Sequence, residues 1–245
     1  MVNPDAQVYA FWTKGFRSGG YNLRNTSPLA APGPFGPETQ KSAELGAKAD
    51  WLDGRLRTNF ALFHNQIDDM QREINLPSGA TGVIQIIRNT ADATIQGAEL
   101  ELQAAFTPDF LMTLQYGYVD GEYDEVIFDL NGDLVVNDAD LALDIPRLAR
   151  NTYGVTFNHD VRLGAVGTLT SRVSFNHRDR SAYTDNNRGT LNSADIVDAS
   201  FALALLEEKL RVSVYGKNLT DHVLEGNDTV TGRNVHDGLR RSKTV

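Results

Sequence analysis

Period-two alternation of apolar and polar side chains recurs along most of the chain, and it limits the fold more than any other feature. In one segment, Ala98, Leu100 and Leu102 alternate with Glu99 and Glu101. Because successive side chains of a strand point to opposite faces, this pattern predicts strands with one apolar and one polar face. Seven segments show this pattern: 55–62, 97–106, 112–118, 152–157, 169–176, 197–205 and 211–215. Two weaker segments, the aromatic-rich 8–16 and 42–51, bring the predicted number of strands to nine. The predicted fold class is all-β and antiparallel.

The connections between these segments alternate strictly between short and long. The short ones lie around residues 53–54, 107–109, 163–165 and 207–209, and the long ones span 17–40, 73–89, 124–147 and 178–195. Outer-membrane barrels have short periplasmic turns and long extracellular loops, whereas a soluble sandwich has no reason to separate the two kinds. The alternation therefore predicts a transmembrane β-barrel segment of about nine strands. A soluble β-sandwich remains the alternative.

Composition excludes several classes of function. The 245 residues include 32 acidic and 23 basic side chains, for a net charge of −9, which argues against general nucleic-acid binding. The absence of Cys excludes thiol catalysis, Cys-based zinc sites and disulfides. No GxSxG, Walker, GxGxxG or HExxH motif occurs, so we do not expect an enzyme. There is no signal peptide, so the chain is either cytosolic or begins downstream of its true start.

Five strings resemble segments of TonB-dependent outer-membrane receptors, and they occur in that family's order. They are KGFRSGGYN at 14–22, AELGAK at 43–48, the residues Phe63, Asp68, Asp69 and Gln71, NTADA at 89–93 with GAELE at 97–101, and YGKNLTD at 215–221. The resemblance covers the C-terminal part of such a receptor's barrel. It implies that 1–221 is a partial barrel from a plugged barrel of about 22 strands. Residues 222–245 are expected to be an irregular tail, disordered or frame-altered, so the chain looks like a fragment without a closing strand.

The resemblance also implies a function for the parent protein. It would import a large, scarce nutrient, such as a ferric siderophore, haem, cobalamin or an oligosaccharide, across the outer membrane of a Gram-negative bacterium. Its partners would be outer-membrane lipid, the extracellular nutrient, and the energy-coupling TonB complex, which acts through a plug that this chain lacks. Two alternatives stay open: a passive porin-like barrel and a soluble calcium-dependent β-sandwich that binds a ligand.

One string has the spacing of a metal site. In DLNGDLVVNDAD at 129–140, the oxygen-bearing side chains are Asp129, Asn131, Asp133, Asn137 and Asp140, with a backbone carbonyl available from Val135. These fall at positions 1, 3, 5, 9, 12 and 7 of a 12-residue calcium loop. Position 6, where the turn favours Gly, is Leu134. The spacing predicts a Ca²⁺ site, with a solvated acidic loop as the alternative; no other cofactor is expected.

A second polar group lies on a strand. Glu99, Glu101 and Gln103 share one strand face. In a barrel, such a row is expected to line a water-filled lumen, with Arg55, Arg57 and Arg172 nearby.

Overall fold

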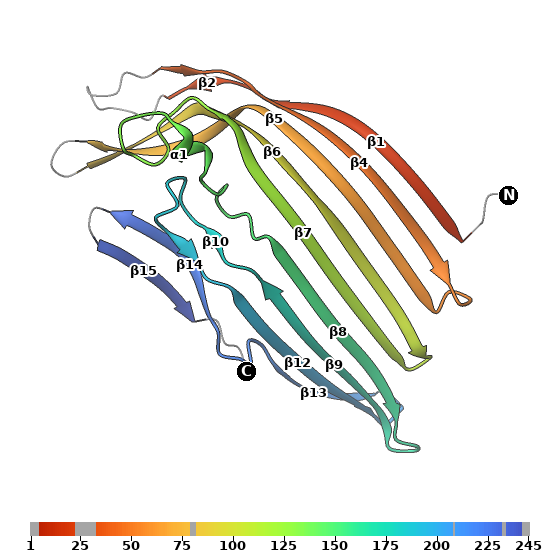
Figure 1. The fold of residues 1–245 in the computed structure, drawn as a ribbon. Coiled ribbons are helices and arrows are strands. Elements are labelled where there is room, and N and C mark those ends of the chain that lie inside the picture. The colour runs from red at the N-terminus through yellow and green to blue at the C-terminus, as the bar shows by residue number, and fades with distance from the viewer. Residues whose placement is uncertain (1–4, 23–32, 79–81, 208, 232–233, 242–245) are drawn as a thin grey trace.

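Nine strands form one curved antiparallel sheet in the computed structural model, which describes residues 5–22, 33–78, 82–207, 209–231 and 234–241 (Figure 1). The strands are β1 (Ala6–Arg17), β4 (Glu38–Trp51), β5 (Leu56–Ser78), β6 (Gly82–Thr107), β7 (Phe110–Val126), β8 (Asn151–Arg162), β9 (Gly167–Arg178), β12 (Ala194–Leu205) and β13 (Leu210–Gly216). Their order in the sheet is their order in the chain. The prediction of an all-β antiparallel fold of nine strands is confirmed.

Short and long connections lie at opposite ends of the sheet, as the sequence predicts (Figure 1). The turn between β4 and β5 is tight, with left-handed backbone at Leu52, Asp53 and Gly54 (φ of 56°, 56° and 79°). The long connections carry small elements: β2 (Gly20–Tyr21) paired with β3 (Pro34–Phe35), α1 (Asp138–Leu141), and β10 (Ser181–Ala182) paired with β11 (Thr190–Leu191). No helix of the described residues has the length and apolar character needed to cross a membrane.

The prediction of a long loop at 73–89 is wrong. β5 and β6 stay paired well beyond their neighbours, as far as Ser78 opposite Gly82. A register shift follows Ile67, where Asp69 adopts a φ of 56°, and pairing then resumes. The segment around Val83 is rich in β-branched residues, which favour an extended backbone even where Pro and Gly lie close by.

The expectation of an irregular tail at 222–245 also differs from the structure. β14 (Val223–Thr231) and β15 (Asn234–Arg241) form a hairpin of their own, separate from the nine-stranded sheet. Val and Thr recur in β14, and such β-branched residues favour strands. Residues 242–245 lie outside the described residues. The division into a barrel part at 1–221 and a distinct tail stays a prediction.

One face of the large sheet is apolar and exposed. Side chains on it include Phe60, Phe157, Phe201, Val212 and Val214, which are 42%, 38%, 42%, 57% and 63% exposed. In the described residues every other sheet has two strands, so no second sheet of a sandwich covers this face. The β-sandwich alternative is therefore wrong. A bare apolar face is what strands that contact lipid present.

The buried apolar core lies at the end that carries the long connections. It consists of Met70, Ala91, Ala93, Tyr123, Val126, Leu130 and Ile145. The last two come from the connection 127–150, so this connection packs against β5, β6 and β7. The contact is close at Gly121, where a Cβ atom would lie 2.6 Å from Cδ2 of Leu148. This rim loop is thus held by apolar packing.

The two outer strands of the sheet, β1 and β13, each have one unpaired edge in the described part of the chain. Unpaired backbone groups are costly in lipid and promote aggregation in water. We therefore expect the isolated chain to be monodisperse only in detergent, as measured by size-exclusion chromatography with light scattering. A monomer that melts cooperatively in detergent-free buffer would contradict this expectation.

Candidate functional site

The polar face of the sheet is built from rows of residues that lie directly opposite one another on neighbouring strands. One row, from β4 to β9, is Lys48, Asn59, Glu101, Gln115, Gly154 and Asn176. Because the strand period is two, the residues two positions away repeat the same face. The predicted group of Glu99, Glu101 and Gln103 therefore belongs to a polar surface that crosses six strands.

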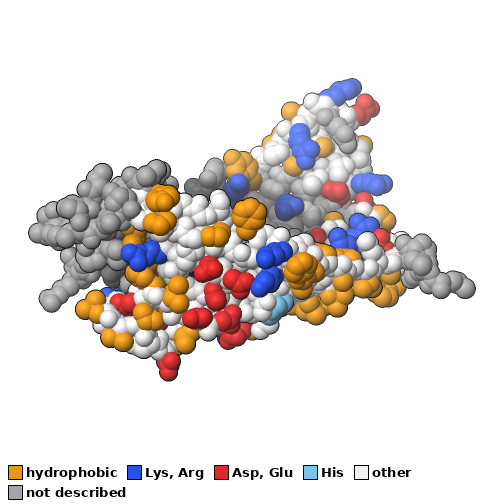
Figure 2. Space-filling model, turned by 90° about the horizontal axis from the view of Figure 1, so that it is seen from above, with side chains coloured by type: hydrophobic (Ala, Val, Ile, Leu, Met, Phe, Trp, Pro, Cys, Tyr) orange, Lys and Arg blue, Asp and Glu red, His pale blue; other side chains and the backbone are white. Residues whose placement is uncertain are grey.

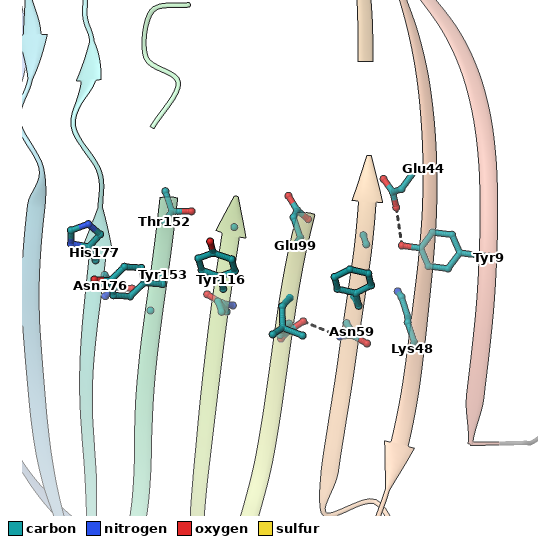
Figure 3. A pocket seen from close by; sticks show the side chains of 17 residues that line it. Tyr9, Glu44, Lys48, Asn59, Glu99, Tyr116, Thr152, Tyr153, Asn176 and His177 are labelled. Atoms are coloured by element: carbon teal, nitrogen blue, oxygen red, sulfur yellow. Dashed lines mark hydrogen bonds between the residues drawn. The ribbon is translucent and has the colours of Figure 1, made fainter. Parts of the chain in front are cut away.

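An open recess of about 520 Å³ lies on this polar face (Figure 3). Tyr9 Oη donates a hydrogen bond to Glu44 Oε1 at 2.8 Å, and Asn59 Nδ2 donates to Glu101 Oε2 at 2.9 Å. Figure 3 shows Tyr9 and Glu44 directed toward one another from neighbouring strands, with Asn59 on the next strand. Side-chain hydrogen bonds thus link neighbouring strands across the polar face beside the recess.

The recess is acidic. Its lining includes the carboxylates of Glu44, Glu99 and Glu101 but only one ammonium group, that of Lys48. Lys48 Nζ lies 5.8 Å from the ring centre of Tyr9. Figure 2 shows acidic and basic side chains in adjoining groups on the face seen from above. Such a surface suits polar or cationic groups.

Of the arginines that we predicted beside this surface, Arg57 lies directly opposite Gln103, whereas Arg55 donates from Nε to the Leu52 carbonyl at 3.2 Å in the short turn. Arg57 pairs with Asp50, with Nε 2.7 Å from Oδ1, one row nearer the short turns. Arg172 on β9 donates a hydrogen bond from Nη1 to Oδ1 of Asn158 on β8 at 3.4 Å. None of the three arginines lines the recess. In the described residues, Lys48 is thus the basic side chain that lines the acidic recess, and Arg57 lies one row away from it.

At the rim, three of the resemblance strings meet. Gln71, 8% exposed, donates from Nε2 to the carbonyl oxygens of Ser18 at 3.1 Å and Gly36 at 2.8 Å. Its backbone N–H donates to Glu38 Oε2 at 2.7 Å, and its carbonyl accepts from Arg17 Nη2 at 2.8 Å. Arg17 also pairs with Glu38 at 2.9 Å. One glutamine thus joins β5 to both ends of the first long connection.

Two asparagines complete this junction. Asn22 donates to the Ile87 carbonyl at 2.9 Å and accepts from the Ile87 N–H at 2.7 Å. Asn89 accepts from the Gly36 N–H at 2.6 Å and donates to the Asp69 carbonyl at 2.7 Å. Each side-chain amide donates one hydrogen bond to a backbone carbonyl and accepts one from a backbone N–H, as the backbone of a neighbouring strand would. The first long connection is therefore fastened to the β5–β6 hairpin by amide side chains.

The last resemblance string forms a turn. Asn218, 4% exposed with a φ of 51°, accepts from the His222 N–H at 3.0 Å and donates to the His222 carbonyl at 2.9 Å. Its own N–H donates to Asp198 Oδ1 at 2.7 Å. NLTD therefore ends β13 and turns the chain away from the sheet.

The calcium candidates lie together in the rim loop. Asp129 accepts the backbone N–H groups of Gly132 at 2.7 Å and Leu134 at 2.8 Å. Leu134, at the sixth position, has a φ of 76°, so the turn has the conformation for which the spacing favours Gly. The loop therefore has the predicted bend, although the residue there is not the preferred one.

The loop oxygens already have protein partners. Asp140, fully buried, accepts from Leu130 and Asn131 N–H, each at 2.9 Å, and from Asn137 N–H at 3.0 Å. Asn131 and Asp133 accept from the N–H groups of Asp133 and Val135, at 2.8 Å and 2.9 Å. Within the described ranges, no three His, Cys, Asp or Glu side chains are grouped to hold a metal. The calcium site stays a prediction.

A further cluster was missed by the sequence analysis. His177 on β9 lies between two carboxylates, with Nδ1 2.6 Å from Asp195 Oδ1 and Nε2 3.1 Å from Asp179 Oδ1. The side-chain amide of Asn151 donates to Asp179 at 2.6 Å and, together with His177, holds the pKa of that carboxyl below its ordinary value. Tyr153 stacks on the imidazole at 4.5 Å. The cluster ties β8, β9 and β12 together, and nothing in the local spacing signals it.

Comparison with known proteins gives a consistent result. The family model for the TonB-dependent receptor-like β-barrel matches residues 1–219. The ferric-pyoverdine 358 receptor of Pseudomonas putida is 24% identical over 244 residues, which are 98% of this chain and 27% of that protein. The solved ferric yersiniabactin uptake receptor of Yersinia pestis superposes with a TM-score of 0.80 at 21% identity, covering 99% of this chain and 34% of the receptor.

A copper transporter shares the same fold. It superposes with a TM-score of 0.69 at 12% identity, covering 98% of this chain and 37% of the transporter. The chain thus spans about a third of the length of these relatives. Since the family model covers most of its residues, the chain belongs to the TonB-dependent receptor-like β-barrel family.

Proposed function

We propose that this chain forms part of the wall and rim of an outer-membrane receptor that takes up a ferric siderophore in a Gram-negative bacterium. The observation that carries the proposal is the nine-stranded sheet with a bare apolar face, a polar face around a recess, and all long loops at one end. The names of the P. putida and Y. pestis relatives support an iron–siderophore cargo. Because a copper transporter has the same barrel fold, the fold alone does not determine the cargo.

The geometry assigns a part to each surface. The apolar face contacts membrane lipid, because apolar side chains need no hydrogen-bonding partners there. The polar face lines a water-filled lumen through which cargo passes. The long connections face the outside and contact the ligand, while energy from the TonB complex enters through a portion of the receptor outside this chain. The family consists of transport receptors, so binding and passage are the proposed activity and no bond is made or broken.

The test is uptake of iron-55 supplied as ferric pyoverdine or ferric yersiniabactin by iron-starved cells. Deleting in frame the gene segment that encodes residues 6–216 should abolish uptake of one of these complexes, and a plasmid copy should restore it. A protonophore should stop uptake in the wild type, since active transport needs an energised inner membrane. Uptake that continues in de-energised cells would favour the passive porin-like alternative, and unchanged uptake after the deletion would refute the proposal.

A further inference from the structure

Two long connections meet at the rim, and they are held in different ways. The first is the rim loop described above, residues 127–150, from here on called the platform, which contributes Leu130 and Ile145 to the buried apolar core. The second is the hairpin 181–191, here called the strap, which runs from β10 to β11. In the described residues this core cluster contains no residue of the strap, whose buried apolar residues, Ala182 and Leu191, lie at its two ends. The platform is therefore anchored by an apolar cluster that the middle of the strap does not join.

Polar contacts join the strap to the platform. Asn187 Oδ1 accepts from the Asp144 N–H at 2.7 Å, and Asn187 Nδ2 donates to the Asp144 carbonyl at 2.9 Å. Arg188 Nη2 donates to the Asn131 carbonyl at 3.0 Å. The Arg147 N–H donates to the Ala182 carbonyl at 2.7 Å. Water can replace such hydrogen bonds with little net change in free energy, which is not true of buried apolar contacts.

One ion pair joins the strap to β5, a strand far from it in the sequence. Asp185 Oδ1 at the strap tip lies 2.8 Å from Arg72 Nε on β5, and the two side chains are 29% and 23% exposed. Arg72 Nη2 also donates to Tyr123 Oη at 3.4 Å. Neither Arg72 Nε nor Asp185 Oδ1 has a well-aligned hydrogen bond in the described structure, so the pair is held by charge. Loss of either charge leaves the other partly buried without its counter-charge.

The strap also forms one wall of a recess of about 720 Å³. The platform contributes Asp144, Ile145 and Leu148 to the lining, and the strap contributes Ala182, Asn187 and Thr190. Movement of the strap away from the platform would therefore open this recess to the outside.

We propose that the strap is a lid that opens on a fixed platform, and that the Arg72–Asp185 ion pair is its latch. The platform keeps its place because its apolar contacts resist water. The middle of the strap separates because its contacts to the platform are hydrogen bonds and the stacking of Arg147 on Tyr183 at 4.8 Å, and its only ion pair in the described structure is the latch. This inference goes beyond the proposed function, since it concerns motion of the chain and needs no particular ligand.

The test is hydrogen exchange resolved to single amides, on the full natural chain that contains this sequence, in detergent. The amides of Asp144 and Arg147 are bonded to the strap, whereas those of Leu130 and Asn131 are bonded to Asp140 inside the platform. In Arg72→Gln, the first two amides should exchange roughly tenfold faster, because one member of a partly buried pair is lost. The amides of Leu130 and Asn131 should keep their wild-type rates.

Three further variants complete the test. Asp185→Asn should reproduce the effect of Arg72→Gln, and the double exchange Arg72→Asp with Asp185→Arg should restore slow exchange. Arg162→Gln breaks an exposed pair with Asp109, 3.6 Å apart at the short-turn end, and should change none of the four amides. Equal acceleration of all four amides would show general unfolding of the rim, and unchanged rates in both single variants would show that the pair is no latch. Either result overturns the proposal.

Discussion

Replacing Asp140 with alanine is expected to unfold the platform, residues 127–150. Asp140 is fully buried and accepts three backbone N–H groups, from Leu130, Asn131 and Asn137. Each buried donor left without a partner costs about 1–3 kcal/mol, so we expect a total loss of roughly 3 kcal/mol or more. The capping box that begins α1 is lost with the same carboxylate. The measurement is amide exchange of Leu130 and Asn131, which should approach the unfolded rate.

Asp133 gives the matched control in the same loop. It is exposed, and its carboxylate accepts only local N–H and amide groups of the loop. Asp133→Ala should therefore leave the exchange of Leu130 close to wild type. Repeating both variants with calcium and with a chelator also tests the calcium prediction. An effect of Asp140→Ala that is the same in both solutions fits a structural carboxylate; an effect seen only with calcium would mean that Asp140 is a metal ligand.

The strands could be predicted from sequence because each faces two different environments. Alternation such as that around Leu100 reflects one polar and one apolar side, and it predicted seven of the nine strands of the large sheet, while 8–16 and 42–51 were weaker predictions. The prediction failed where that contrast ends. In the β5–β6 hairpin, Pro77 and Gly82 were interpreted as loop residues although the strands remain paired there.

The rim junction could be located only in part. The strings that contain Asn22, Gln71 and Asn89 were recognised by resemblance, but their contacts were not predicted. These amides bond backbone groups as many as 65 positions away, and a side chain bonded to a distant backbone leaves no periodic pattern. The same applies to Arg72 and Asp185, which are joined only by the folding of two loops. Within the platform, Leu134 is unfavourable for a calcium loop by sequence because Gly is preferred at that position, yet its φ is 76°.

The second large effect is expected at Gly97, where β6 lies against β7. A Cβ atom there would overlap the backbone oxygen of Tyr118 and lie 2.6 Å from Cζ of Phe63. A backbone oxygen in a paired strand cannot move aside without breaking the ladder, so Gly97→Ala should cost about 3 kcal/mol, the upper part of the range for overpacking. The measurement is the thermal unfolding midpoint of the full natural chain in detergent.

Gly15 on β1 provides a control of the same chemical change, because nothing lies within 4 Å of the position its Cβ would take. Gly15→Ala removes only the conformational freedom of glycine in the unfolded chain, so it should stabilise the protein by roughly 0.5–1 kcal/mol. The two variants should therefore shift the midpoint in opposite directions. Equal shifts would mean that the separation of β6 and β7 at Gly97 is wrong, and with it the position of Glu99 and Glu101 on the polar face.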